Sequence, residues 1–294
     1  MVPMISALAL ALSVAMSQRS DSLRDAIATR IAASPGAVVG LSFEDLQTGD
    51  KILINADTIF HAASTMKIPV MIEVLRRAKA GAFSLDQEVL LVNQFSSIVD
   101  GSPYPMLKAD DEDTTLYALV GTRVPIRNLL KRMITRSSNL ATNELISLVG
   151  AKNVTAMARA IGAQHTNVLR GVEDQKAFDA GLINTTTAAD LATMLLTIDR
   201  GTALSPEASA EMKDILLAQE VNDKIPAGLP PGTPVAHKTG EITAVSHDAA
   251  VVYPPGRKPY VLVVLTRGLR DSAQSTALIA DISRIVYAHV MGSH

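Results

Sequence analysis

The sequence contains no cysteine and no tryptophan, and only 3% of its 294 residues are aromatic. The absence of cysteine excludes disulfide bonds, thiolate metal sites, a cysteine nucleophile and a lipoprotein anchor. With so few aromatic side chains, a core must be built mainly from Leu, Ile, Val, Ala and Met, and the 48% of hydrophobic residues is sufficient for one. A chain of this length is expected to form one large domain or two modest ones.

An excess of charge of one sign is also lacking, because 27 basic and 29 acidic residues leave a net charge of −2. No basic stretch is of the kind that binds nucleic acid, so we expect no nucleic-acid partner. One acidic run, Asp110-Asp111-Glu112-Asp113, lies in a long loop predicted for residues 94–115. We interpret this run as a solvated surface; the alternative is a calcium site, which no glycine-centred loop pattern supports. Neither a metal nor another cofactor is expected.

Long apolar runs are missing beyond residues 4–16, which read MISALALALSVAM. This run is too short to span a bilayer comfortably, and polar residues follow it at once. Small residues at Ser13 and Ala15 offer a cleavage site. Residues 1–17 are therefore predicted to be a secretory signal peptide, with no stable membrane anchor in the mature chain. The charged region that normally precedes such a run is missing, and the alternative is a buried N-terminal helix.

Apolar spacing and turn residues predict strands, then many helices, then strands again. Strands are expected over residues 37–43, 51–55, 235–238, 247–253 and 260–266, and the clearest helices over residues 22–33, 126–135, 140–149, 153–161, 188–199, 206–218 and 272–290. This order predicts a two-lobed α+β fold, in which the N- and C-terminal segments share one antiparallel sheet flanked by helices. The α/β lobe would take residues 18–60 and 219–294, and an all-α lobe residues 61–218. A cleft between lobes is a common place for a small-molecule site.

A serine and a lysine three residues apart, Ser64 and Lys67, stand where an apolar run begins. If the run is a helix, both side chains lie on one face, and Lys67 can take the proton of Ser64. A serine needs such a base to become a reactive nucleophile, and the N-terminus of a helix favours negative charge. Alone, the pair is better explained as an N-cap serine beside a solvated lysine, so other motifs must decide.

Two further motifs follow in order. Ser137-Ser138-Asn139 lies in a polar break between two apolar helices, and Lys238-Thr239-Gly240 follows a short strand. Ser-x-x-Lys, Ser-x-Asn and Lys-Thr-Gly in this order are the signature of penicillin-recognising serine enzymes. The chain therefore resembles a class A β-lactamase or a close relative, from about Ser22 to Val290. Three flanking segments are also similar to those of the family: residues 58–63, 133–135 and 185–189.

The resemblance implies roles for four catalytic residues. Ser64 would be the acylated nucleophile, Lys67 a candidate base, and Ser137 the relay of a proton to the leaving nitrogen. Glu173 lies 34 residues after the asparagine of the second motif, close to the family's spacing, and would activate the water that deacylates the enzyme. Asp174 is the nearest rival, and a solvated loop acid is the simpler alternative.

The resemblance also implies five substrate-binding residues: Asn139, Lys238, Thr239, Gly240 and Glu241. Asn139 would bind the side-chain amide of the substrate, while Lys238 and Thr239 would bind its carboxylate. The glycine would let the substrate lie close along the strand. The backbone N–H groups of Ser64 and Glu241 would form the oxyanion hole. The acidic side chain of Glu241 is unusual and is expected to tune which anionic substrates are accepted.

The loop around Glu173 departs from the family pattern. Arg170 is one residue further from Glu173 than the usual arginine, and the aspartate that pairs with this arginine corresponds to Asn184. The asparagine that helps to hold the deacylating water has no clear match near Ala177. His247 falls near the position of a further arginine, where it either contributes to carboxylate recognition or is simply a strand histidine. A slow enzyme would fit these changes.

The function expected is that of a secreted or periplasmic bacterial serine β-lactamase, a monomer that acts on a small-molecule β-lactam. One alternative is a penicillin-binding or sensor-type domain that is acylated but deacylates slowly. Another is a D-Ala-D-Ala peptidase or esterase on the same scaffold. The presence of Glu173 favours the lactamase over the peptidase.

Overall fold

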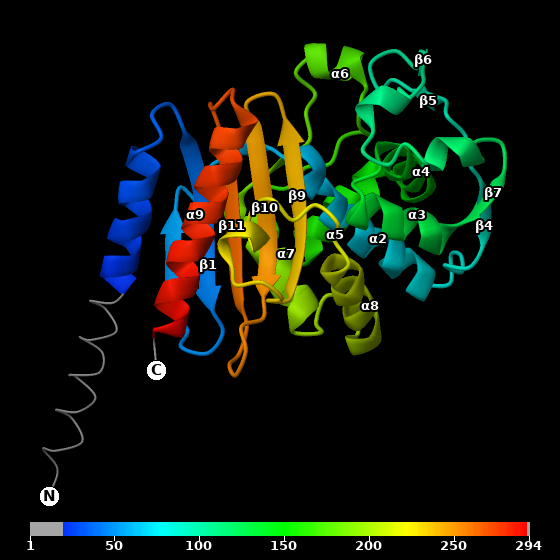
Figure 1. The fold of residues 1–294 in the computed structure, drawn as a ribbon. Coiled ribbons are helices and arrows are strands. Elements are labelled where there is room, and N and C mark those ends of the chain that lie inside the picture. Colours follow the sequence, from blue (N-terminus) through cyan, green and yellow to red (C-terminus); the bar gives the residue numbers. More distant parts are fainter. Residues whose placement is uncertain (1–19, 293–294) are drawn as a thin grey trace, which may run out of the picture.

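Five antiparallel strands form the sheet of the computed structural model, which describes residues 20–292. Their order is β2-β1-β11-β10-β9, so the two N-terminal strands lie beside the last three (Figure 1). The strands are β1 Val38–Asp45, β2 Lys51–Ile54, β9 Val235–Ile242, β10 Val245–Val252 and β11 Tyr260–Arg267. This arrangement confirms the α+β fold with a sheet shared by both ends of the chain. The signal peptide predicted for residues 1–17 lies outside the described residues.

Helices pack on both faces of the sheet. A helix over residues 20–32 and α9 (Ser272–Met291) lie on one face, and α7 (Ala188–Asp199) packs against the other (Figure 1). Side chains of β11 alternate between two cores, with Leu262 on the α9 side and Val263 on the α7 side. The strand is thus buried on both faces, which explains its continuous apolar sequence.

The second lobe lies beyond β9 and is mostly helical (Figure 1). α2 (Lys67–Lys79) forms its centre, where every residue from Lys67 to Leu75 is buried. The other helices are α3 Ile126–Thr135, α4 Asn139–Val149, α5 Ala151–Ala160, α6 Gln175–Asp179 and α8 Pro206–Leu217. Short strands and 3-10 turns connect them: β3 Phe60–His61, β4 Glu88–Leu90, β5 Phe95–Ser96, β6 Pro103–Tyr104, β7 Arg123–Pro125, β8 Thr185–Thr186, η1 Ala63–Met66, η2 Lys108–Asp110 and η3 Leu116–Leu119. A further 3-10 turn, η4 Pro226–Gly228, packs against α9. We propose that the lobes divide the chain as expected, at 18–60 and 219–294 against 61–218.

Several predicted elements agree closely with the structure. The helices predicted for 126–135 and 188–199 match α3 and α7 at both ends. The strand predicted for 235–238 is longer, because β9 keeps its pairing with β10 as far as Ile242. The sequence concealed this extension, since a glycine and a glutamate interrupt the apolar pattern. Within residues 20–292, no helix has the length and apolar character needed to cross a membrane.

The loop predicted for residues 94–115 contains the β5–β6 hairpin and the η2 turn. The interpretation of its acidic run as a solvated surface is wrong for Asp111 and Asp113, which are 4% and 2% exposed. Asp111 accepts the N–H of Leu140 at the start of α4 at 2.8 Å, and Asp113 pairs with Arg132 of α3 at 2.6 Å. These carboxylates therefore tie the loop to the two helices that flank the second motif.

Candidate active site

Ser64 lies in the η1 turn, which leads directly into α2. The α-helix begins at Lys67, three residues later than a helix with Ser64 at its start, and the N–H of Lys67 donates to the carbonyl of Ser64. On the other side of the turn, the Oγ of Thr65 donates to the carbonyl of Ala62 at 2.5 Å. These local bonds fix Ser64, half-buried, at the wall of a pocket.

The amine of Lys67 points at the polar break between α3 and α4. It donates to the carbonyl of Ser137 at 2.6 Å, to Oγ of Ser137 at 3.1 Å and to Oδ1 of Asn139 at 2.9 Å. Three acceptors match the three hydrogens of an ammonium group. Within the described chain, Oγ of Ser64 is not among the hydrogen-bond partners of Lys67. Lys67 therefore contacts the second motif, where the sequence had predicted contact with Ser64.

Ser137 lies between two amines. Its Oγ accepts from Lys67 and, at 3.0 Å, from Nζ of Lys238 on β9. The next residue, Ser138, caps α4 by accepting the N–H of Ala141 at 3.3 Å, which fixes the start of the helix. The three sequence motifs therefore meet at a single hydroxyl group.

Asn139 connects this cluster to the loop that carries Glu173. Its Oδ1 accepts from Lys67, while its Nδ2 donates to the carbonyl of Asp110 at 3.2 Å and to Oε1 of Glu173 at 3.4 Å. Both functional groups of the amide are thus used. A chain of polar contacts runs from β9 through the second motif to the loop glutamate.

A second asparagine, Asn143 on α4, holds the loop just before Glu173. Its Oδ1 accepts the N–H of Val172 at 2.7 Å, and its Nδ2 donates to the carbonyl of Val172 at 3.0 Å. The chain passes so close that a Cβ on Gly171 would lie 2.3 Å from Oδ1 of Asn143. Sequence reasoning missed Asn143, whose one signal was a polar residue on the buried face of an apolar helix.

Arg170 and Asn184 hold the other side of the loop through hydrogen bonds from their side chains to backbone groups. The guanidinium of Arg170 donates to the carbonyls of Leu182 and Gly171, both at 2.9 Å. Asn184 donates to the carbonyl of Arg170 at 3.0 Å and accepts the N–H of Leu169 at 2.8 Å. An amide thus holds the backbone here, in place of the arginine–carboxylate pair of the family pattern.

Asp174, the rival of Glu173, uses both carboxylate oxygens for structure. Oδ1 accepts the N–H of Ala177 and caps α6, and Oδ2 accepts the N–H of Ile98 at 2.9 Å. Asp174 is buried, whereas Glu173 is exposed. Of the two acids, Glu173 therefore has its carboxylate less engaged by the backbone.

The third motif lies along the edge strand β9, pressed against η1. The ammonium of Lys238 also donates to the carbonyl of Thr239 at 2.9 Å. A Cβ on Gly240 would lie 3.0 Å from the backbone nitrogens of both Ser64 and Thr65. Backbone atoms cannot rotate away, so a side chain at this position would push strand and turn apart. The glycine therefore permits the close approach of the first and third motifs.

A pocket of about 350 Å³ opens between β9, η1 and the loop of Glu173, a size suited to a small molecule. Four predicted site residues line it: Ser64, Asn139, Glu173 and Glu241. Lys67, Ser137 and Lys238 lie behind this wall, at 0%, 7% and 0% exposure. The other lining residues are His61, Ala63, Arg170, Val172, Asp174, Gln175, Phe178, Asn184, Ile242 and Thr243.

Backbone strain concentrates around the pocket. Among the described non-glycine residues with left-handed φ, Ala63 (+45°) precedes the nucleophile candidate, and Ser137 (+54°) and Glu173 (+59°) are predicted site residues. Such conformations cost energy and persist where the surroundings over-determine them, as they do at active sites. The strain thus identifies the same place as the motifs.

Burial shifts the pKa values of both amines. It lowers the pKa of Lys67 to about 8, although the charges of Asp111, Glu112 and Glu173 oppose the shift. It also lowers the pKa of Lys238 well below its usual value, and the nearby charge of Lys67 adds to this. Loss of solvation within the pocket raises the pKa of Glu173. Perturbed groups that converge in one cleft are typical of an active site.

His247 lies in the interior of the sheet. It is 0% exposed, its Nδ1 accepts the N–H of Thr266 at 3.1 Å, and its Nε2 donates to the carbonyl of His61 at 2.8 Å. Burial lowers the pKa of its imidazole to about 4, so the ring is neutral at physiological pH. Of the two alternatives for His247, the structure therefore favours a strand histidine that ties β10 to β3.

No group of three or more histidine or carboxylate side chains that could hold a metal ion occurs among residues 20–292.

Known proteins resemble this chain over most of its length. The model of the beta-lactamase enzyme family matches residues 22–290. A β-lactamase of Streptomyces albus G is 28% identical over 256 residues, covering 85% of this chain and 79% of the relative. The β-lactamase AST-1 of Nocardia asteroides is 30% identical over 256 residues, covering 85% and 78%.

Solved structures share the fold. A mutant of PBP-A, described as an acyl-enzyme complex with penicillin G, superposes with a TM-score of 0.81 at 29% identity, covering 92% of this chain and 97% of that one. An ancestral class A β-lactamase superposes with a TM-score of 0.78 at 30% identity, covering 90% and 99%.

Proposed function

The chain belongs to the beta-lactamase enzyme family, and we propose that it hydrolyses the β-lactam amide through an acyl-enzyme on Ser64. The observation that carries the proposal is a shared pocket. Ser64, Asn139 and Glu173 line it together, and the buried contacts of Ser137 with two lysines lie directly behind it. A nucleophile, a proton relay and a water-activating acid are thus within reach of one bound molecule.

In the proposed acylation, Oγ of Ser64 attacks the β-lactam carbonyl carbon and gives its proton to neutral Lys67. The N–H groups of Ser64 and Glu241 bind the oxyanion that develops. As the ring C–N bond breaks, Lys67 returns a proton through Ser137 to the leaving nitrogen. The product is an ester of Ser64 with the opened ring.

The proposed binding mode places the substrate against β9. The hydroxyl of Thr239 binds its carboxylate, the ammonium of Lys238 supplies positive charge from behind the pocket wall, and Asn139 binds its side-chain amide. Gly240 permits this because it has no Cβ, which would otherwise fill the narrow space between β9 and η1. The substrate therefore spans from the third motif to the second.

Deacylation is assigned to Glu173. The carboxylate removes a proton from a water molecule, the resulting hydroxide attacks the ester carbonyl, and Ser64 leaves and recovers a proton. Asn139, whose Nδ2 lies 3.4 Å from Oε1 of Glu173, orients the carboxylate. The ring-opened acid dissociates, and the enzyme returns to its unmodified form.

The pKa of Lys67 predicts how acylation depends on pH. With a pKa of about 8, roughly one tenth of the amine is neutral at pH 7, and only the neutral form accepts a proton. The second-order rate constant for acylation should therefore rise about tenfold per pH unit below this pKa and level off above it. Stopped-flow measurement of acylation across this range tests the assignment. A profile that is flat from mildly acidic to mildly alkaline pH would contradict it.

Turnover of a chromogenic cephalosporin by the purified protein tests the proposed function. We expect continuous release of product over many enzyme equivalents. The second candidate is a penicillin-binding domain that stays acylated. The similarity to PBP-A and the departures of the Glu173 loop support it. A single burst of one equivalent would favour that candidate, and activity restricted to acyl-D-Ala-D-Ala peptides or simple esters would favour a peptidase or esterase.

The proposal includes export. The protein would act as a monomer in the periplasm or outside a bacterial cell, after removal of residues 1–17. The apolar run at residues 4–16 supports this. N-terminal sequencing of the protein from a periplasmic fraction tests it, and a retained first residue would contradict it.

A further inference from the structure

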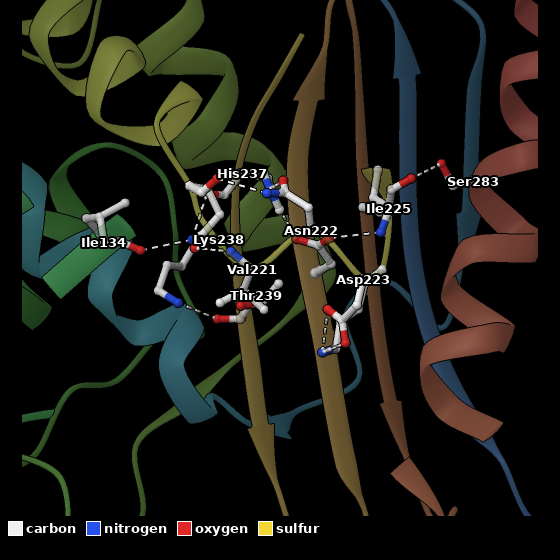
Figure 2. Close-up of polar contacts among 12 residues, drawn as sticks. Ile134, Val221, Asn222, Asp223, Ile225, His237, Lys238, Thr239 and Ser283 are labelled. Carbon is white, nitrogen blue, oxygen red and sulfur yellow. Dashed lines mark hydrogen bonds and ion pairs between the residues drawn. The ribbon is translucent and has the colours of Figure 1, made fainter. Parts of the chain in front are cut away.

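The segment of residues 219–225, here called the strap, is pinned across the sheet beside the pocket. Asn222 accepts from Nε2 of His237 at 3.1 Å (Figure 2). Nδ1 of that histidine lies 3.0 Å from Oδ1 of Asp248. The other oxygen of Asp248 accepts the N–H of Ile225 at 3.0 Å, and Ser283 donates to the carbonyl of Ile225 at 2.8 Å. The strap therefore holds its remaining side chains in fixed places.

One of these side chains is Lys224, a cation enclosed by the protein. Its side chain is 2% exposed, and its Nζ lies 3.0 Å from Oε2 of Glu241 and 3.4 Å from Oδ1 of Asp223. Burial alone would lower the pKa of Lys224, but the hydrogen bond to Glu241 and the charge of Asp223 outweigh it and raise that pKa. Lys224 is thus a permanent positive charge next to β9.

Glu241 is the partner of this cation on the pocket side. Its side chain is 39% exposed and lines both the active-site pocket and the adjoining hollow of about 370 Å³. It stands two residues after Thr239 on β9, so both side chains project from the same face of the strand. Thr239 is a proposed ligand of the substrate carboxylate. A carboxylate of the pocket lining therefore already neutralises the buried cation of the strap.

We propose that Glu241 is a specificity-determining residue, an internal carboxylate that competes with the carboxylate of the substrate for the charge of Lys224. This rests on the proposed function and names the substrate class. Compounds with an uncharged group at this edge of the pocket bind without opposition, whereas compounds with a free carboxylate must share or displace the ion pair. Two carboxylates facing one ammonium disfavour each other, which is a form of selection by repulsion.

A matched pair of substrates tests this: benzylpenicillin and its methyl ester, in which one methyl group removes the charge of the carboxylate. In Glu241→Gln, the ratio of acylation rate constants for acid over ester should rise by about tenfold, through tighter binding of the acid and not a faster chemical step. Adding Lys224→Met should remove that gain, because the freed cation is then missing. Asp223→Asn is the control, since it alters the same lysine but lies outside the pocket lining; the ratio should change by less than about twofold.

An unchanged ratio in Glu241→Gln, in an enzyme that both compounds still acylate, overturns this inference and leaves the proposed function intact. A gain that survives Lys224→Met also overturns it. If neither compound acylates the unmodified enzyme, both the proposed function and the inference fail.

Discussion

Glu173→Gln should convert the enzyme into one that is acylated by a β-lactam and remains so. Glutamine keeps the size of the side chain and its contact with Asn139 but cannot take a proton from water. Loss of a general base typically costs about 10²- to 10⁴-fold, so deacylation should slow by that factor while acylation persists. Quenched-flow sampling with intact-protein mass spectrometry measures the two steps separately.

The structure supplies a matched control one residue away. Asp174 binds two backbone N–H groups, so Asp174→Asn should lower the free energy of unfolding by about 1–3 kcal/mol and leave the deacylation rate within a few fold. If Glu173→Gln turned over at the original rate and Asp174→Asn stayed acylated, the assignment of the two acids would be reversed.

Ser64→Ala should abolish turnover, by on the order of 10⁴- to 10⁶-fold, because the proposed ester forms on the Oγ that this substitution removes. Ser137 cannot replace it, because this residue is only 7% exposed and its Oγ already accepts hydrogen bonds from Lys67 and Lys238. The variant should bind the substrate without forming a covalent adduct, which mass spectrometry and equilibrium binding distinguish.

Ser209→Ala is the matched control for that variant. Among the described residues, Oγ of Ser209 is buried with no hydrogen-bond partner, and it lies on α8, outside the pocket lining. Activity and adduct formation should be retained. Residual turnover by Ser64→Ala at more than about one per cent of the original rate would mean that another nucleophile acts.

The sequence predicted the main residues of the site because each of its three motifs is a short segment whose residue types indicate their chemistry. Ser64, Ser137 and Lys238 are far apart in the chain, yet contacts of 3.1 and 3.0 Å join Lys67 and Lys238 at one hydroxyl. The apolar periodicity of α3 and α7 was equally direct. The motifs and the apolar periodicity can each be recognised within a single segment of the sequence.

Partners that depend on the path of the backbone were not predictable in the same way. Lys67 contacts Ser137 and Asn139 where the chain passes through a left-handed φ at Ser137, and no spacing rule predicts that conformation. The ion pair of Lys224 with Glu241 forms because the strap crosses toward β9. The burial of Asp111 likewise follows from the start of α4, which needs an acceptor for the N–H of Leu140.

The proposed hydrolysis requires that Ser64 is acylated by a β-lactam and then released. Intact-protein mass spectrometry after mixing with benzylpenicillin measures both steps. We expect a transient mass increase of one penicillin, mapped to the peptide of Ser64, followed by return of the unmodified protein. An adduct that persists indefinitely would contradict hydrolysis, and an adduct on another residue, or none on folded protein, would contradict the site itself.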